Sequence, residues 1–88
     1  DMKANGGYIT TEDLKKYNAK IRPPVIGTYR GFEIIGPSPP SSGGTTLIQM
    51  LNMLETFDLK KIKHDDPQRV HLFTEVMKRA YRERAAFI

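Results

Sequence analysis

The sequence predicts an α+β segment that consists of a short helix, a β-hairpin and two longer helices. Apolar residues recur at helical spacing over residues 47–57 and again over 70–81, which is typical of two amphipathic helices. Between residues 24 and 35, two runs of β-branched and aromatic residues flank the dipeptide Arg30-Gly31, as expected for a tight hairpin turn.

The first helix is predicted to run from Thr11 to about Tyr17. Thr10 precedes it and is a good N-cap, and Asp13 stands at the third helical position, as in a capping box. Asn18 is a suitable stop signal. The threonine pair at the start of this helix therefore has a sufficient structural explanation.

A proline-rich loop, residues 36–46 (GPSPPSSGGTT), connects the hairpin to the next helix. The prolines favour extended backbone, the two serines offer capping oxygens, and Gly43-Gly44 permit either a positive φ or a close approach to other backbone. Such a junction can present unpaired amide N–H groups to an anion, or it can simply be a well-capped turn.

The second helix is predicted to begin at Thr45 or Thr46 and to end near Phe57. Its apolar positions are Leu47, Ile48, Met50, Leu51, Met53, Leu54 and Phe57. A helix that is apolar around most of its circumference requires burial on more than one side. One hairpin and one further helix can hardly cover it, so residues 1–88 are expected to be a single partial domain of something larger.

A polar connection over residues 58–66 precedes the third helix, which is predicted to have Asp66 as its N-cap and Pro67 at its first position. No glycine or proline interrupts it through Ile88. Its expected apolar face consists of Val70, Phe73, Val76, Met77, Ala80 and Tyr81.

Composition excludes several classes of function. The chain has 88 residues, 39% of them hydrophobic and 27% charged, which is ordinary for a globular protein. Without cysteine it can hold neither a disulfide framework nor a thiolate metal site nor a cysteine nucleophile. No apolar run is long enough to cross a bilayer. The net charge of +4 comes from scattered residues, and the densest group, residues 78–84, suits a solvated helix end better than a nucleic-acid interface.

A metal site is not expected. The candidate ligands His64, Asp65, Asp66, His71 and Glu75 match no ligand motif. Only His71 and Glu75 would share a helix face, and two ligands do not close a site.

Four stretches of the sequence together resemble the γ-glutamyltransferase (γ-glutamyltranspeptidase) family. They are residues 39–55, which begin PPSSGG, residues 5–14 (NGGYITTEDL), residues 22–31 and residues 80–84 (AYRER). Because they occur in order over essentially the whole chain, the resemblance is to an internal piece of the family's large subunit.

The resemblance implies a parent enzyme with the αββα sandwich of N-terminal-nucleophile hydrolases. Such an enzyme cleaves γ-glutamyl amides of the glutathione type and passes the acyl group to water, an amino acid or a peptide, with no cofactor. Its partners would be the rest of the large subunit, the small subunit and small γ-glutamyl substrates, without nucleic acid. A related branch acts on poly-γ-glutamate or on β-lactam side-chain amides. A bacterial parent would be periplasmic or secreted, although the sequence itself selects no compartment.

No catalytic residue is assigned to this chain. The family's nucleophile is an N-terminal threonine that opens the small subunit, whereas Thr10-Thr11 and Thr45-Thr46 are internal and lie where helices need caps. The chain alone is therefore expected to be inactive. The only candidate substrate-binding residues are those of the loop Ser41, Ser42, Gly43 and Gly44, which we place on the active-site side.

Two other interpretations remain open from the residues alone. The chain could be a stand-alone anion-binding or protein-interaction module that uses residues 41–46 and the basic helix end, or a scaffold piece with no site. The sequence gives even less support to a phosphate-loop enzyme, because no lysine follows Gly43-Gly44.

Overall fold

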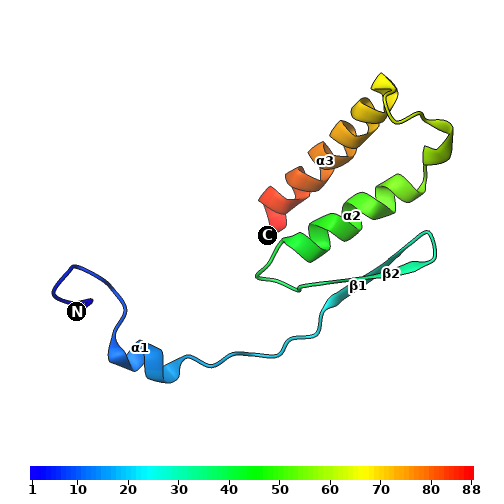
Figure 1. Cartoon of the computed structure of the whole chain (residues 1–88). Helices are drawn as coiled ribbons and strands as arrows, with labels where there is room; N and C mark the ends of the chain where they lie inside the picture. The colour runs from blue at the N-terminus through cyan, green and yellow to red at the C-terminus, as the bar shows by residue number, and fades with distance from the viewer.

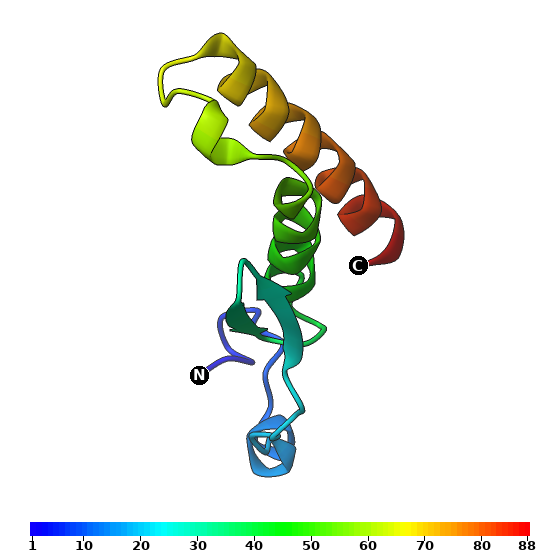
Figure 2. The same ribbon diagram turned by 90° about the vertical axis from the view of Figure 1, so that its right-hand side faces the viewer.

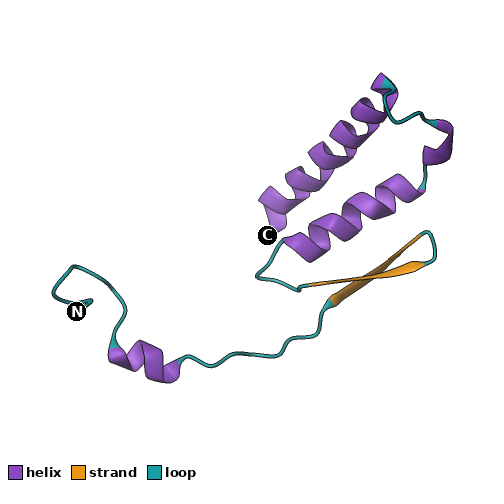
Figure 3. Cartoon of the chain, viewed as in Figure 1, coloured by secondary structure: helices purple, strands orange, loops and turns teal.

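The computed structural model describes residues 1–88 and confirms the predicted order of elements (Figures 1 and 3). The elements are α1 (Thr11–Lys16), β1 (Val25–Tyr29), β2 (Phe32–Gly36), α2 (Gly43–Glu55), the 3₁₀ turn η1 (Leu59–Lys61) and α3 (Pro67–Phe87).

Helix α2 is the middle layer of the structure. Both strands pack against one side of it and α3 packs against another, whereas α3 and the strands are separated by α2 (Figures 1 and 2). The helices α2 and α3 run antiparallel, because the segment between them turns the chain back (Figure 1). The elements therefore stack in the order hairpin, α2, α3.

The first 24 residues form an arm that leads away from these three layers (Figure 1). All of them are exposed, including the apolar side chains of α1. The predicted capping box is confirmed, since Asp13 N–H donates to Thr10 Oγ1 at 3.2 Å and Thr10 N–H donates to Asp13 Oδ2 at 2.9 Å. A helix of six residues is therefore held by its own cap, without a packed face.

The predicted hairpin turn is also confirmed. Arg30 and Gly31 both have positive φ, 48° and 85°, which is the backbone of a type I′ turn and matches the twist of paired strands. The pairing places Tyr29 opposite Phe32 and Ile26 opposite Ile35. The side chain of Arg30 connects this turn to the end of α2, because its Nη2 donates to the Phe57 carbonyl at 2.8 Å.

Two glycines allow the hairpin and α2 to touch through their backbones. A Cβ atom on Gly44 would lie 2.5 Å from the Pro37 carbonyl oxygen and 2.7 Å from Val25 Cγ2. A Cβ atom on Gly36 would lie 2.7 Å from the Cα of Gly44. Neither position has room for a side chain, so the close approach predicted for the glycine pair is confirmed at Gly44.

The predicted start of α2 was wrong by two or three residues. The helix begins at Gly43, not at Thr45 or Thr46, and it ends at Glu55. Neither Gly43 nor Gly44 takes a positive φ. The tertiary contact with Gly36 requires a residue without a side chain at Gly44, which places glycine in the first helical turn despite its low helix propensity.

Helix α3 begins as predicted, with Asp66 Oδ1 accepting the Gln68 N–H at 2.8 Å and Pro67 at the first position. Its buried stripe is narrower than predicted, since only Val76 and Ala80 are buried, while Val70 is 67% exposed. Met77 and Tyr81, also expected on this face, are exposed as well. The stripe is narrow because α3 packs only on α2.

The connection between α2 and α3 is more ordered than a polar linker. It contains η1, and Arg69 of α3 reaches back to its carbonyl groups. The Arg69 Nη2 donates to the Leu59 carbonyl at 2.9 Å and also to the Ile62 carbonyl. One guanidinium therefore ties the start of α3 to several backbone carbonyl groups of the turn.

The core is small. Only five of the 88 residues are buried, namely Gly44, Thr46, Leu54, Val76 and Ala80. On the outer face of the hairpin, Ile26 and Ile35 are 61% and 64% exposed. None of the helices combines the length and the apolar character that crossing a membrane demands.

The glycine contact yields a test with a matched control. We expect Gly44→Ala to lower the free energy of unfolding of the intact protein by about 1–3 kcal/mol, because the added methyl overlaps backbone and β1. Gly43→Ala should leave it unchanged or raise it by less than about 1 kcal/mol, since a Cβ atom there would meet only Ser41 Oγ, at 3.6 Å. Denaturant unfolding of both variants measures the difference, and equal effects would contradict this account.

Candidate functional site

The candidate loop, Ser41 to Gly44, lies where the chain passes from the hairpin into α2 (Figure 1). Ser41 is exposed, and its Oγ accepts the Gly43 N–H at 3.3 Å. Gly44 is buried against the hairpin and has no surface to offer a ligand. The four residues predicted together therefore divide, with Ser41 and Gly43 facing outward and Gly44 facing inward.

Ser42 occupies the N-cap position of α2 but does not cap the helix. Its backbone is helical, with φ −85° and ψ −14°, and its side chain makes no capping hydrogen bond. Its Oγ accepts a hydrogen bond from Arg84 Nε at 2.9 Å instead. The capping role expected for the two serines thus falls to Ser41 alone.

A hollow of about 180 Å³ lies beside Ser42 and Gly43, between α2 and the end of α3. Tyr81 and Arg84 of α3 line it, together with Thr46 of α2. Arg84 also stacks near the Tyr81 ring, 6.0 Å from its centroid. The first turn of α2 contains no acidic residue, so the hollow is flanked by a guanidinium and by a helix N-terminus without a compensating carboxylate.

The sequence did not predict that Arg84 meets Ser42. The two residues are 42 positions apart, and no local pattern links a helix end to a loop so distant. The one available signal was that both residues belong to stretches that carry the family resemblance.

The internal threonines have structural positions. Thr10 caps α1, and Thr45 and Thr46 lie in the first turns of α2. Thr46 is 7% exposed, and its Oγ1 is buried without a hydrogen-bond partner. None of these hydroxyl groups has a histidine or an amine within hydrogen-bond distance that could act as a base.

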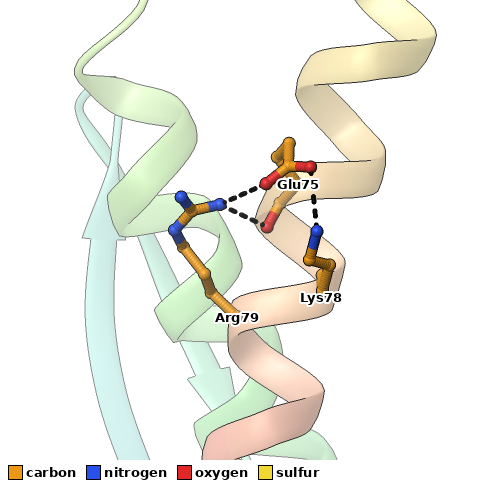
Figure 4. Close-up of polar contacts among 3 residues, drawn as sticks. All are labelled: Glu75, Lys78 and Arg79. Atoms are coloured by element: carbon orange, nitrogen blue, oxygen red, sulfur yellow. Dashed lines mark hydrogen bonds and ion pairs between the residues drawn. The ribbon is translucent and has the colours of Figure 1, made fainter.

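The residues considered as metal ligands are not brought together into a group of three or more. Asp66 is used as the cap of α3, and Glu75 is surrounded by cations on its own helix. Figure 4 shows Glu75 between Lys78, at 3.1 Å, and Arg79, at 2.8 Å. Arg79 also donates to the Glu75 carbonyl, at 3.1 Å.

Glu75 and Arg79 stand at the edge of a larger, open groove of about 930 Å³ between α2 and α3. Its floor is apolar, with Met53, Leu72 and Val76 among its lining residues. The hydrogen bonds from Arg79 and then from Lys78 hold the pKa of the Glu75 carboxyl below its ordinary value. The carboxylate is therefore stabilised in its charged form and is not prepared to act as a general acid near neutral pH.

Comparisons with known proteins agree on one family. The family model described as gamma-glutamyltranspeptidase matches residues 1–88. The Acylase ACY 1 proenzyme of Pseudomonas sp. (strain SE83) is 48% identical over 84 residues, which cover 96% of this chain and 15% of that protein. The glutathione hydrolase proenzyme of Escherichia coli (strain K12) is 42% identical over 88 residues, which cover 100% of this chain and 15% of that protein.

A solved structure is similar throughout the chain. The crystal structure of Helicobacter pylori gamma-glutamyltranspeptidase aligns with a TM-score of 0.94 and 50% identity, over 99% of this chain and 25% of that chain. The chain thus spans about 15% of the length of the two curated relatives described above. The matched fold includes the arm, the hairpin and both long helices.

The ion pairs of Glu75 lead to a prediction about pH. Since the pKa of Glu75 is lowered in the folded state, its contribution to stability is present above the ordinary glutamate value of 4.5 and is lost as pH falls through the lowered pKa. Arg79→Gln and Lys78→Gln should each raise the pKa of Glu75, because each removes a hydrogen bond and a positive charge that favour the carboxylate. Titration of the Glu75 carboxyl carbon by NMR measures both shifts. An unchanged pKa in either variant would contradict the assignment.

Proposed function

The chain belongs to the gamma-glutamyltranspeptidase family, and we propose that it is an internal part of an enzyme that cleaves γ-glutamyl amides such as glutathione. The observation that carries this proposal is the match of the family model to every residue of the chain. The identity of 50% to a gamma-glutamyltranspeptidase of known structure supports it.

In the proposed reaction, the hydroxyl of an N-terminal threonine attacks the γ-carbonyl of the substrate and releases the amine. The resulting γ-glutamyl ester is then attacked by water, an amino acid or a peptide, which restores the free hydroxyl. This threonine lies outside the 88 residues and is exposed by self-cleavage. Both curated relatives described above are named proenzymes, which supports a maturation step of this kind.

The role proposed for the chain is to build part of the large subunit. The hairpin, α2 and α3 form one stack, and the exposed apolar faces of α1 and the hairpin fit burial against the rest of the subunit. The loop Ser41 to Gly44 is proposed to face the substrate, with Ser41, Ser42 and Gly43 as its accessible members. No cofactor is required by this chemistry.

A second candidate function is hydrolysis of an amide whose acyl group is not γ-glutamyl. The observation that favours it is the 48% identity to a protein named an acylase proenzyme, which is comparable with the 42% to a glutathione hydrolase. Both reactions would pass through an ester of the nucleophilic threonine and would differ in the acyl group that it carries, so the fold of this chain serves either.

The first experiment is intact-mass measurement and N-terminal sequencing of the purified natural protein. We expect two chains, one of which begins with threonine, because the nucleophile requires a free α-amine as its base. A single uncleaved polypeptide of 88 residues would overturn the proposal and favour the stand-alone binding module. A long uncleaved chain would contradict the proposed maturation and the activity that depends on it.

The same preparation decides between the two candidates. The ratio of kcat/KM for a γ-glutamyl amide to that for a matched amide without the α-amino and α-carboxyl groups should exceed about tenfold for a γ-glutamyltransferase. A ratio below one would favour the acylase function.

The loop assignment is tested with Ser42→Ala in the intact enzyme. We expect KM for the γ-glutamyl donor to rise by about three- to tenfold, the size of one lost hydrogen bond. Ser38→Ala is the matched control, because Ser38 lies in the same proline-rich loop but outside the candidate residues. If Ser42→Ala leaves both kcat and KM unchanged, the loop does not face the substrate.

A further inference from the structure

The contact between Arg84 and Ser42 joins the last turn of α3 to the candidate loop. Arg84 Nε donates to Ser42 Oγ at 2.9 Å. The other hydrogen bonds between two side chains join residues no more than four positions apart. This one alone links two distant elements through their side chains.

The two helix dipoles have opposite effects on the Arg84 charge. Arg84 is favoured at the C-terminus of α3, where the carbonyl groups are unpaired, but it also lies beside the N-terminus of α2, where a cation is disfavoured. An uncharged partner for Ser42 would avoid this cost. The arrangement is therefore poorly suited to stabilising α2, and it places a guanidinium beside the loop.

Ser42 is available to Arg84 because it does not cap α2. The side chain that caps the start of α2 is Ser41, whose Oγ accepts a hydrogen bond from the Gly43 N–H. Because the Ser42 backbone is helical, its side chain is not in the geometry of an ordinary N-cap, and its hydroxyl bonds to Arg84 instead. Arg84 thus restrains the Ser42 side chain in the loop.

We propose that Arg84 is a positioning residue, which holds the Ser42 side chain and the Ser41–Gly44 backbone in the geometry that the substrate meets. The inference rests on the proposed function, in which this loop faces the substrate. Arg84 itself acts through Ser42, with the Tyr81 ring beneath its guanidinium restricting its conformations.

The test uses the intact enzyme and two readouts. Arg84→Gln should raise KM for a γ-glutamyl donor about tenfold, with kcat changed less than about twofold, since one charge-assisted hydrogen bond is lost. Arg84→Lys, which retains a cationic donor, should recover part of this loss. Arg82→Gln is the matched control, because Arg82 is on the same helix, is exposed and makes no hydrogen bond to another side chain.

The double variant gives the critical comparison. If Arg84 acts through Ser42, the variant with both Ser42→Ala and Arg84→Gln should have the same KM as either single variant. Effects that multiply to about a hundredfold would overturn the inference, because they would show that the two residues act independently.

Hydrogen–deuterium exchange supplies the readout that does not depend on activity. Arg84→Gln should speed exchange in a peptide that covers residues 37–47 and leave one that covers residues 25–35 unchanged, whereas Arg82→Gln should alter neither. Unchanged exchange over 37–47 would overturn the positioning role. Absence of γ-glutamyl turnover in the unmodified enzyme would instead reject the proposed function, and the exchange result would still decide the role of Arg84.

Discussion

The backbone contact between Gly36 and Gly44 sets the geometry of the whole stack. Because neither residue has a side chain, β2 can leave the hairpin and α2 can begin with their main chains nearly touching. This contact brings α2 close enough to the sheet that a Cβ atom at Gly27 would lie 2.6 Å from Ile48 Cγ2. Ser42, two residues before Gly44, faces α3, where its Oγ accepts a hydrogen bond from Arg84.

Arginine side chains then hold α2 at both of its ends. Near its C-terminus, the guanidinium of Arg30 donates a hydrogen bond to the Phe57 carbonyl. The backbone N–H of Arg30 donates to the Glu55 carboxylate at 3.0 Å. Here the cation agrees with the helix dipole. At its N-terminus, Arg84 binds Ser42 against the dipole. The first contact is thus explained by stability alone, whereas the second needs a further reason, which positioning of the loop supplies.

The sequence could predict what is determined locally. The capping box of Thr10 and Asp13, the Arg30-Gly31 turn and the Asp66 cap each depend on residues within three positions, and all three are confirmed. The start of α2 was missed because glycine has a low helix propensity, whereas the contact of Gly44 with Gly36 requires glycine in the first turn of this helix. The sequence could place the proline-rich loop between the hairpin and α2, but the division of Ser41 to Gly44 into inward and outward residues depends on contacts with the hairpin and α3. Family resemblance, not local pattern, led to the enzyme class.

Because the core is small, the backbone contact of Gly44 and the hydrogen bond of Arg84 contribute more to the shape of the loop than side-chain burial does. With five buried residues, the stack has little packed volume to transmit strain, and its outer apolar faces remain open. In the proposed large subunit, the segments that cover those faces would supply much of the stability, whereas the glycine contact and the Arg84 guanidinium restrain the loop. Changes at the hairpin surface should therefore act on folding, while changes at Arg84 should act on the loop. The two properties are separable because different residues carry them.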